Sequence, residues 1–433
     1  MKTPDYISSI SDEVINPKLN HNKIAASILE EHKLIYSAGD FFEYSDGYYK
    51  RLEDQLILQG IKSKIGDKFS SKFKTEVLLS LSTDVFIPVT QLNSTHLLNL
   101  KNGFFDISNL TLSPHMPEIY STIRLNVNYI PGCSCDLWVK TITEIFEGNT
   151  EKVDLLQEFF GLCLTRETKF EKALLLVGEG ANGKSTILSG LQAFLGPENY
   201  TAIPLERFDD PHYISSLFGK LANISIETNA KSQVYDSVFK AIVSGDPVTV
   251  DPKYRNPFTF SPFCKLIFAV NGLPRVEDKT DAFFRRLLIL RFNRQFAENE
   301  QNKTLKTELL KELDGIFLWA LEGLKRLRER GYFILTDEMG KAIEEYRQEN
   351  NSLFSFVEEI CKLDLMASVS KAALYLAYSS WCKDNGYKPL NKKRFGMELI
   401  KRFRQVKDFA THVGRIWEGI TIEHSSITKS FTP

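Results

Sequence analysis

The sequence contains no apolar run long enough to cross a membrane. No stretch of its 433 residues approaches the roughly 18 to 20 consecutive apolar residues that a membrane helix needs. The first residues, MKTPDY, also lack the apolar segment of a secretory signal. We therefore predict a cytoplasmic protein with no membrane partner.

Cysteine is scarce as well. The six cysteines are scattered, and only Cys133 and Cys135 lie close together, with no second pair and no histidine cluster nearby. This spacing favours reduced thiols and predicts no zinc site.

The sequence also has no excess of charge of either sign. Its 54 Lys and Arg residues balance 55 Asp and Glu residues, which gives a formal net charge of -1. Composition alone therefore does not indicate nucleic-acid binding, and any DNA contact must come from local patches. Hydrophobic residues make up 43% of the chain and aromatic residues 12%, as in well-packed globular proteins. A chain of this length should form about two to four domains.

The most informative stretch is an apolar strand followed by a glycine-rich loop and a helix. Residues 174–177 (LLLV) lead into GEGANGKST at 178–186, and apolar residues at helical spacing come next. This is the GxxxxGKS spacing of a P-loop, in which glycines let backbone N–H groups turn toward phosphate oxygens. The Lys184 ammonium would reach the β and γ phosphates, and the Ser185 hydroxyl would bind Mg²⁺. The predicted cofactors are ATP and Mg²⁺, and the predicted nucleotide-binding residues are Gly178, Glu179, Gly180, Ala181, Asn182, Gly183, Lys184, Ser185 and Thr186.

Two later strands end in polar residues that could act on the same nucleotide. Residues 220–227 (KLANISIE) predict a strand that ends in Glu227, and residues 265–270 (KLIFAV) predict a strand followed by Asn271. Because the carboxyl ends of parallel strands meet at one edge of a sheet, both side chains are expected beside the loop. Glu227 would polarise the attacking water, and Asn271 would hydrogen-bond the γ-phosphate or that water. The alternatives are a solvated glutamate and an asparagine that caps a turn.

A candidate DNA contact lies between these two strands. Residues 248–260 predict two short strands with prolines at both shoulders, which would place Lys253, Tyr254 and Arg255 on a hairpin tip. Two cations and one aromatic ring suit single-stranded nucleic acid. The alternative is that all three are ordinary solvated loop side chains.

A pair of arginines precedes the apolar strand predicted at 287–292. Arg285 and Arg286 could bind surface carboxylates, or they could reach a nucleotide bound by a neighbouring subunit as arginine fingers. The residues themselves leave both interpretations open.

The last segment combines three helical patterns with a basic face. The patterns cover 354–360, 371–383 and a third segment through Phe395, and residues 414–422 predict a hairpin. Residues 388–415 hold nine Lys or Arg residues against two acids. Three helices ending in a basic one before a hairpin predict a winged helix-turn-helix, and the alternative is a helical lid with a solvated basic face. The DNA-binding residues predicted here are Lys392, Lys393, Arg394, Lys401 and Arg404.

The remaining patterns complete the domain division. Residues around 45–47 and 101–103 predict β-hairpins, and residues 138–164 and 303–330 predict helices. We predict an α+β N-terminal domain (1–135), an α/β ATPase core with its preceding helices (136–300), a helical linker or lid (301–350) and a winged-helix DNA-binding domain (351–433).

Taken in order, these segments resemble superfamily 3 helicases. The resemblance rests on GEGANGKST, LANISIET, GDPVTVDPKYRNPFTF, LIFAVNG and AFFRRLLILRF, and it covers residues from about 40 to 425. The likeness is closest to the phage and plasmid primase-helicase family that includes the poxvirus-type NTPase-primases. It implies an AAA+-like P-loop ATPase that assembles into a hexameric ring, binds single-stranded DNA in its central channel and translocates 3′ to 5′ at a replication origin or fork.

The resemblance also implies roles for individual residues. These are Walker A for Lys184 and Ser185, the acidic end of Walker B for Glu227, the sensor position for Asn271, the DNA-binding hairpin tip for Lys253 and Tyr254, and the trans-acting finger for Arg285 or Arg286. The implied metal ligands are Ser185 and Glu227. Many relatives carry two adjacent acids at Walker B, whereas Ile226 precedes Glu227 here, so Mg²⁺ would depend on Ser185, water and phosphate.

The predicted function is that of an ATP-dependent replicative DNA helicase of a phage, plasmid or other mobile element. The expected partners are single-stranded and forked DNA, duplex origin DNA, a primase or polymerase, and further copies of the chain in a homo-hexamer, in the cytoplasm or nucleoid of a bacterial host. The chain begins too close to the helicase region for an upstream primase-polymerase domain, so primase activity is not expected. The alternative is an origin-binding replication initiator that is switched by ATP and has little unwinding activity.

Overall fold

The computed structural model describes residues 20–226, 233–234, 236–253, 256–276, 281–387, 389–412 and 414–423. These residues form two compact units. Unit 1 comprises the described residues up to Ile226, those within Ser237–Gly272 and those within Leu290–Ile334. Unit 2 comprises Gln233, Val234, Asp236, the described residues within Leu273–Ile289 and those from Leu335 onward. The four-part division predicted from the sequence stays a prediction. Within the described ranges, no helix has the length and hydropathy to span a membrane.

A five-stranded sheet lies at the centre of the α/β part of the chain. Its order is β15-β7-β13-β9-β8, built from β7 (Ala173–Val177), β8 (Tyr200–Thr201), β9 (Ala222–Ser225), β13 (Lys265–Val270) and β15 (Leu287–Arg291). Strands β7, β13, β9 and β8 run parallel. All residues of β9 and β13 are buried, which explains why the sequence shows these strands as near-continuous apolar runs. The strands predicted at 174–177 and 265–270 are confirmed, and the one predicted at 220–227 is present as β9, with Glu227 outside the described residues.

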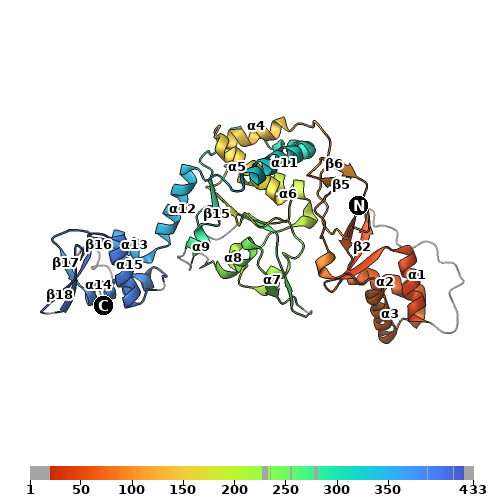
Figure 1. Cartoon of the computed structure of the whole chain (residues 1–433), viewed down its shortest axis with the longest axis horizontal. Helices are drawn as coiled ribbons and strands as arrows, with labels where there is room; N and C mark the ends of the chain where they lie inside the picture. Colours follow the sequence, from red (N-terminus) through yellow and green to blue (C-terminus); the bar gives the residue numbers. More distant parts are fainter. Residues whose placement is uncertain are drawn as a thin grey trace. The chain divides into compact units, whose positions relative to one another are not determined.

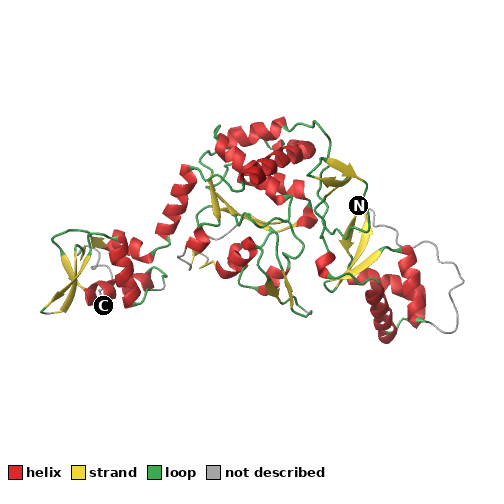
Figure 2. Ribbon diagram, in the orientation of Figure 1, coloured by secondary structure: helices red, strands yellow, loops and turns green. Residues whose placement is uncertain are grey.

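Helices lie on both sides of this sheet (Figures 1 and 2). Helix α6 (Lys184–Leu195) follows the loop after β7 and packs beside α11 (Leu313–Arg330), whereas α7 (Pro211–Ser215) and α8 (Asp236–Ser244) lie on the other side. Because β7, β9 and β13 are parallel, their carboxyl ends share one edge of the sheet. The loop 178–183, Ile226 and Asn271 therefore gather at that edge.

The helices predicted at 138–164 and 303–330 are confirmed. They are α4 (Asp136–Ile145), α5 (Thr150–Cys163), α10 (Leu305–Leu309) and α11. Helices α5 and α11 approach closely at two glycines. A Cβ added to Gly161 would lie 2.3 Å from the Ala320 carbonyl oxygen, and one added to Gly323 would lie 2.5 Å from the Gln157 carbonyl oxygen. Neither position can hold a larger residue unless the helices move apart.

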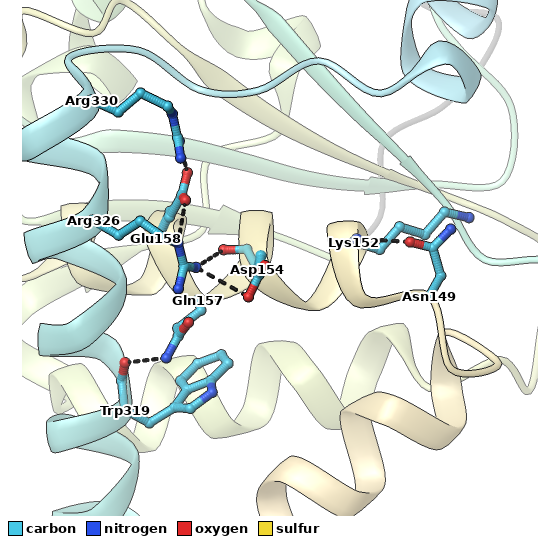
Figure 3. Close-up of polar contacts among 8 residues, drawn as sticks. All are labelled: Asn149, Lys152, Asp154, Gln157, Glu158, Trp319, Arg326 and Arg330. Carbon is cyan, nitrogen blue, oxygen red and sulfur yellow. Dashed lines mark hydrogen bonds and ion pairs between the residues drawn. The ribbon is translucent and has the colours of Figure 1, made fainter.

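Polar side chains also join these two helices (Figure 3). The Glu158 side chain is only 4% exposed, and its two oxygens accept hydrogen bonds from Arg326 Nε at 2.8 Å and from Arg330 Nη2 at 2.5 Å. The Gln157 amide donates to the Trp319 carbonyl oxygen at 2.8 Å. A buried carboxylate is stable only when it is paired and hydrogen-bonded, so the two arginines offset the cost of burying Glu158.

The N-terminal part of unit 1 contains two small antiparallel sheets. The first comprises β1 (Leu34–Ser37), β2 (Asp40–Ser45) and β3 (Tyr48–Arg51). It packs with α1 (His21–Glu31), α2 (Asp54–Ile65) and α3 (Ser71–Asp84). The second sheet comprises β4 (Leu98–Leu100), β5 (Gly103–Asp106) and β6 (Thr111–Ser113). The hairpins predicted at 45–47 and 101–103 are confirmed. Asn126 fixes this part to α6, because its amide donates to the Ala193 carbonyl oxygen at 2.9 Å.

Unit 2 has the arrangement of a winged helix. Its helices α13 (Ser352–Ile360), α14 (Lys371–Asp384) and α15 (Lys392–Arg402) match the three predicted from helical spacing, and its strands are β16 (Cys361–Lys362), β17 (Ser368–Ser370), β18 (Lys407–Thr411), β19 (Gly414–Glu418) and β20 (Thr421–Ile422). Figure 1 shows these helices grouped together with β16, β17 and β18. The buried core between them includes Phe356, Tyr378, Phe395 and Trp417. The same unit contains α9 (Asp281–Phe284) and α12 (Asp337–Glu349).

The hairpin predicted over 414–422 is wrong. Strand β19 pairs with β18 and β17, whereas β20 pairs with β16 in a separate sheet. Gly419 separates the two strands at a φ of 88°, and a Cβ there would lie 2.2 Å from the Gln405 carbonyl oxygen. The wing hairpin is therefore β18–β19. Its first strand begins with the charged residues Lys407 and Asp408, which a search for apolar alternation passes over.

Candidate nucleotide-binding site

The loop between β7 and α6 has a conformation that depends on glycine. Gly183 has a φ of 90°, in the left-handed region, and a Cβ there would lie 2.5 Å from Ile145 Cδ1. At Gly178 an added Cβ would lie 2.8 Å from the Phe292 carbonyl oxygen. No atom of the described residues lies within 4 Å of a Cβ added to Gly180, so their packing does not require glycine there. The open space above Gly180 is what close approach of a ligand to the backbone would need.

Lys184 is held in the curve of this loop. Its ammonium donates hydrogen bonds to the carbonyl oxygens of Gly178 and Glu179, the latter at 3.0 Å, and to Asn182 Oδ1 at 3.2 Å. Asn182 is itself buried, and its amide donates to the Glu179 carbonyl oxygen. Burial lowers the pKa of the Lys184 ammonium from its usual value. The loop therefore concentrates one positive charge at the N-terminus of α6, where the helix dipole also favours an anion.

A cavity of about 970 Å³ opens beside the loop. Its lining consists of residues 179–186, of Leu137, Lys140, Thr141, Glu144 and Ile145 from α4, of Glu206, Ile226, Ala269 and Asn271, and of Phe296, residues 300–303, Leu305 and Lys306. Pockets for small molecules and cofactors typically measure roughly 300–1,000 Å³, so this cavity has room for a nucleotide. The structure thus brings Asn271 and the predicted loop residues from Glu179 to Thr186 together around one space.

The remaining predicted residues are not among the described residues that line the cavity. Glu227, Tyr254 and Arg255 fall outside the residues that the structure describes. Lys253 is exposed beyond the end of β11 (Val248–Val250), which pairs antiparallel with β12 (Phe258–Phe260), so the predicted hairpin is confirmed. The Phe218 ring packs edge-on against Phe258 and Phe260, with centroids 5.5 and 5.4 Å apart, and braces the hairpin.

The two predicted finger arginines differ in exposure. Arg285 is exposed, whereas Arg286 is buried and its Nη1 donates to the Ala282 carbonyl oxygen at 2.6 Å. Both belong to unit 2, whereas the cavity lies in unit 1. Their roles stay a prediction.

The basic residues predicted to bind DNA lie on and just after α15. All five, Lys392, Lys393, Arg394, Lys401 and Arg404, are exposed. Both acids of this segment already bind other cations, since Glu398 pairs with Arg402 at 3.1 Å and Asp408 pairs with Arg415 at 3.1 Å. The local positive charge of the five residues is therefore presented to solvent.

Sequence reasoning missed three carboxylates in the cavity. Four glutamates among the described residues line the space, Glu144, Glu179, Glu206 and Glu300, and only Glu179 was predicted. Arg294 pairs with Glu144 at 3.0 Å and with Glu300 at 3.4 Å, and Gln295 Nε2 lies 3.4 Å from Glu179 Oε2. Glu206, on a short 3-10 helix (Leu205–Arg207) that follows β8, has a buried Oε2 with no hydrogen-bond partner among the described residues. No motif marks Glu206, because its place depends on β8 lying next to β9 in the sheet.

Three families match separate parts of the chain. The family described as "D5 N terminal like" matches residues 9–147, the family described as "Poxvirus D5 protein-like" matches residues 348–418, and a family of unknown function (DUF5906) matches residues 176–286. The last of these ranges contains the glycine-rich loop and Asn271. The two D5 matches flank it on either side.

The chain is also similar to two helicase-named viral proteins. It is 24% identical over 346 residues to L207/L206 of Acanthamoeba polyphaga mimivirus, a match that covers 67% of this chain and 36% of the relative. It is 24% identical over 225 residues to 121R of Invertebrate iridescent virus 3, which covers 47% of this chain and 23% of the relative. The matched region thus spans about a third or less of each relative's length.

Solved structures agree with the fold. Two apo structures of the NrS-1 C-terminal region match 94% of this chain and all of the solved chain, with TM-scores of 0.55 and 0.56 at 12% identity. Together with the parallel sheet, they confirm the predicted α/β fold, with an N-terminal part before the core and a winged-helix-like part after it. The assignment of the core to the AAA+-like ATPases stays a prediction. With the two D5 matches on either side of the core, the chain is similar to D5-type primase-helicase proteins over these ranges.

Proposed function

We propose that this chain is an ATP-dependent DNA helicase that acts in replication. The observation that carries the proposal is the cavity at the carboxyl edge of the parallel sheet, in which Lys184 and Asn271 line the same space. The helicase names of two viral relatives support a helicase or NTPase role at low identity. Translocation from 3′ to 5′, a hexameric ring and a mobile-element setting are finer parts of the same proposal.

The loop would bind the triphosphate as a P-loop. Phosphate oxygens would replace the carbonyl oxygens of Gly178 and Glu179 as partners of the Lys184 ammonium, and the first N–H groups of α6 would donate to the same anion. Asn271 would orient the attacking water or the γ-phosphate through its amide. These groups act by position and charge, which is how most of the catalysis of phosphoryl transfer arises.

The cavity also fits a bound Mg²⁺. Ser185 lies exposed in the first turn of α6, and the buried Glu206 oxygen, which has no partner in the described part of the chain, is a hard ligand of the kind Mg²⁺ prefers. Ser185 and the predicted ligand Glu227 would hold the ion, with Glu206 as a further carboxylate. The ion would neutralise charge on the phosphates during transfer.

Two surfaces are proposed to contact DNA. Lys253, with Tyr254 and Arg255 beyond it, would follow a single strand from the braced hairpin, and the exposed cations of α15 would bind phosphates. If the chain forms a ring, Arg285 or Arg286 would reach the nucleotide of the neighbouring copy as a finger. A primase or polymerase would then act on the separated strands.

The proposal is tested with Lys184→Ala in the full chain. ATP hydrolysis and displacement of a strand from a forked duplex should both be lost, because the variant removes the charge that holds the phosphates. Lys311→Ala, which changes an exposed lysine outside the cavity, is the matched control and should keep both activities. Strand displacement by the Lys184→Ala variant would refute the mechanism.

A second function has its own support in the exposed basic face of α15. In that case the chain is an origin-binding initiator in which ATP controls assembly and the winged helix does the main work. A displacement assay on a duplex with a 3′ tail separates the two functions. An initiator would bind duplex origin DNA tightly and displace nothing.

A further inference from the structure

The cavity has two kinds of lining. The glycine-rich loop, the first turn of α6 and Asn271 supply polar groups suited to phosphate. Apolar side chains from three separate segments also line the space, among them Leu137 and Ile145 from α4, Phe296 after β15 and Leu305 from α10. A nucleotide has the same division, with a charged triphosphate and a flat, weakly polar base.

Phe296 is held beside the loop by its own backbone. Its N–H donates to the Ala181 carbonyl oxygen at 2.8 Å, and its carbonyl oxygen accepts from Gln301 Nε2 at 3.1 Å. Both contacts are independent of the ring, so they would persist if the ring were removed. The half-buried ring is thus placed directly next to the residues expected to bind phosphate.

Arg294 fixes the orientation of that ring. Its guanidinium lies over the Phe296 ring, 4.4 Å from the centroid. The same guanidinium pairs with Glu144 of α4 at 3.0 Å and with Glu300 at 3.4 Å. Two ion pairs, to residues of two separate segments that line the cavity, therefore hold the cation that covers the ring.

We propose that the base of the bound nucleoside triphosphate stacks on Phe296, with Leu137 and Leu305 completing the apolar wall. Arg294 is a positioning residue for this ring. The inference rests on the proposed function, since it names how the same site binds the rest of its substrate. Stacking depends on the area of the base ring and not on the groups at its edge. The affinity for ATP and GTP, which have the larger purine bases, should therefore depend on Phe296 more than the affinity for CTP and UTP does.

The test compares two ligands on the full-length protein. Isothermal titration calorimetry would measure the Kd of ATPγS, which has a base, and of tripolyphosphate, which has none. Phe296→Ala should raise the Kd of ATPγS about ten-fold or more, because a base stacked on an aromatic side chain contributes of that order. The Kd of tripolyphosphate should not change, and Phe296→Trp should keep wild-type affinity for ATPγS.

Tyr332 provides a matched control. Its ring also lies under an arginine, with Arg330 5.5 Å from the centroid, but it does not line the cavity. Tyr332→Ala should leave both Kd values unchanged. Arg294→Ala should raise the Kd of ATPγS in the wild type and have little further effect in the Phe296→Ala background, whereas a general structural role would raise it in both.

Three results would overturn the inference. They are an unchanged Kd for ATPγS in Phe296→Ala, an equal rise for both ligands in that variant, and wild-type protein that binds tripolyphosphate as tightly as ATPγS. In each of these cases phosphate binding survives in the wild type, so the proposed function would stand. Failure of the proposed function itself is recognised differently, because the wild type would then bind neither ligand.

Discussion

Replacing Gly161 with alanine should destabilise the α5–α11 pair, although alanine is the better helix former. The added Cβ would lie 2.3 Å from the Ala320 carbonyl oxygen and 2.7 Å from both the backbone nitrogen and the Cβ of Leu324. Two of these three atoms belong to the backbone of α11 and cannot rotate away. Overpacking of this kind costs up to about 3 kcal/mol, and the gain in helix propensity returns about 1 kcal/mol. The net loss of unfolding free energy should be about 2 kcal/mol.

Gly60→Ala is the matched control for this substitution. Gly60 lies inside α2, and within the described ranges no atom lies within 4 Å of an added Cβ, so only the propensity gain of about 1 kcal/mol remains. The urea concentration at the midpoint of unfolding should therefore fall in Gly161→Ala and rise in Gly60→Ala. Unfolding can be followed by tryptophan fluorescence, to which Trp138 and Trp319 contribute from this core. If Gly161→Ala were as stable as Gly60→Ala, the close approach of the two helices would be refuted.

Three further predictions concern charge. Glu206→Gln should raise the Mg²⁺ concentration for half-maximal ATP hydrolysis about ten-fold. The Kd for nucleotide without Mg²⁺, measured by calorimetry, should not change. An unchanged Mg²⁺ requirement would exclude Glu206 as a ligand. Burial lowers the pKa of the Lys265 ammonium from its ordinary value of 10.5 to about 8. Between these two pH values the unfolded state therefore binds more protons than the folded state, so the free energy of unfolding of the wild type should rise with pH relative to that of Lys265→Met. Parallel pH profiles of the two proteins would contradict this. Removing Lys401 and Arg404 together should lower the slope of log Kd for duplex DNA against log salt concentration by about two. Arg402→Ala, which removes a partner of Glu398, should change this slope less. Equal slopes for the double variant and the wild type would exclude α15 from the DNA interface.

Local signals in the sequence predicted most of the fold. The turn at 45–47 and the turn at 101–103 are encoded by neighbouring residues, and the strand, loop and helix around Lys184 follow from glycine spacing and helical periodicity. The buried strand β13 is legible because both of its faces are covered. In each case the residues that decide the structure lie within one short segment.

The missed features depend on contacts between distant segments. Gly419 ends β19, and the partner of that strand is β18, whose charged residues carry no apolar pattern. Glu206 reaches the cavity only because β8 lies beside β9, and Phe296 only because its N–H bonds to Ala181. Pairing order and backbone contacts over such separations leave no periodic signal in a single sequence.

The central claim is that nucleotide turnover in this cavity is coupled to DNA. The most direct test is the rate of ATP hydrolysis by the full-length wild type with and without single-stranded DNA, beside Lys253→Ala at the hairpin tip. We predict that DNA raises the rate of the wild type and raises that of Lys253→Ala much less, while the two rates without DNA are equal. A rate that does not respond to DNA in the wild type would contradict the account.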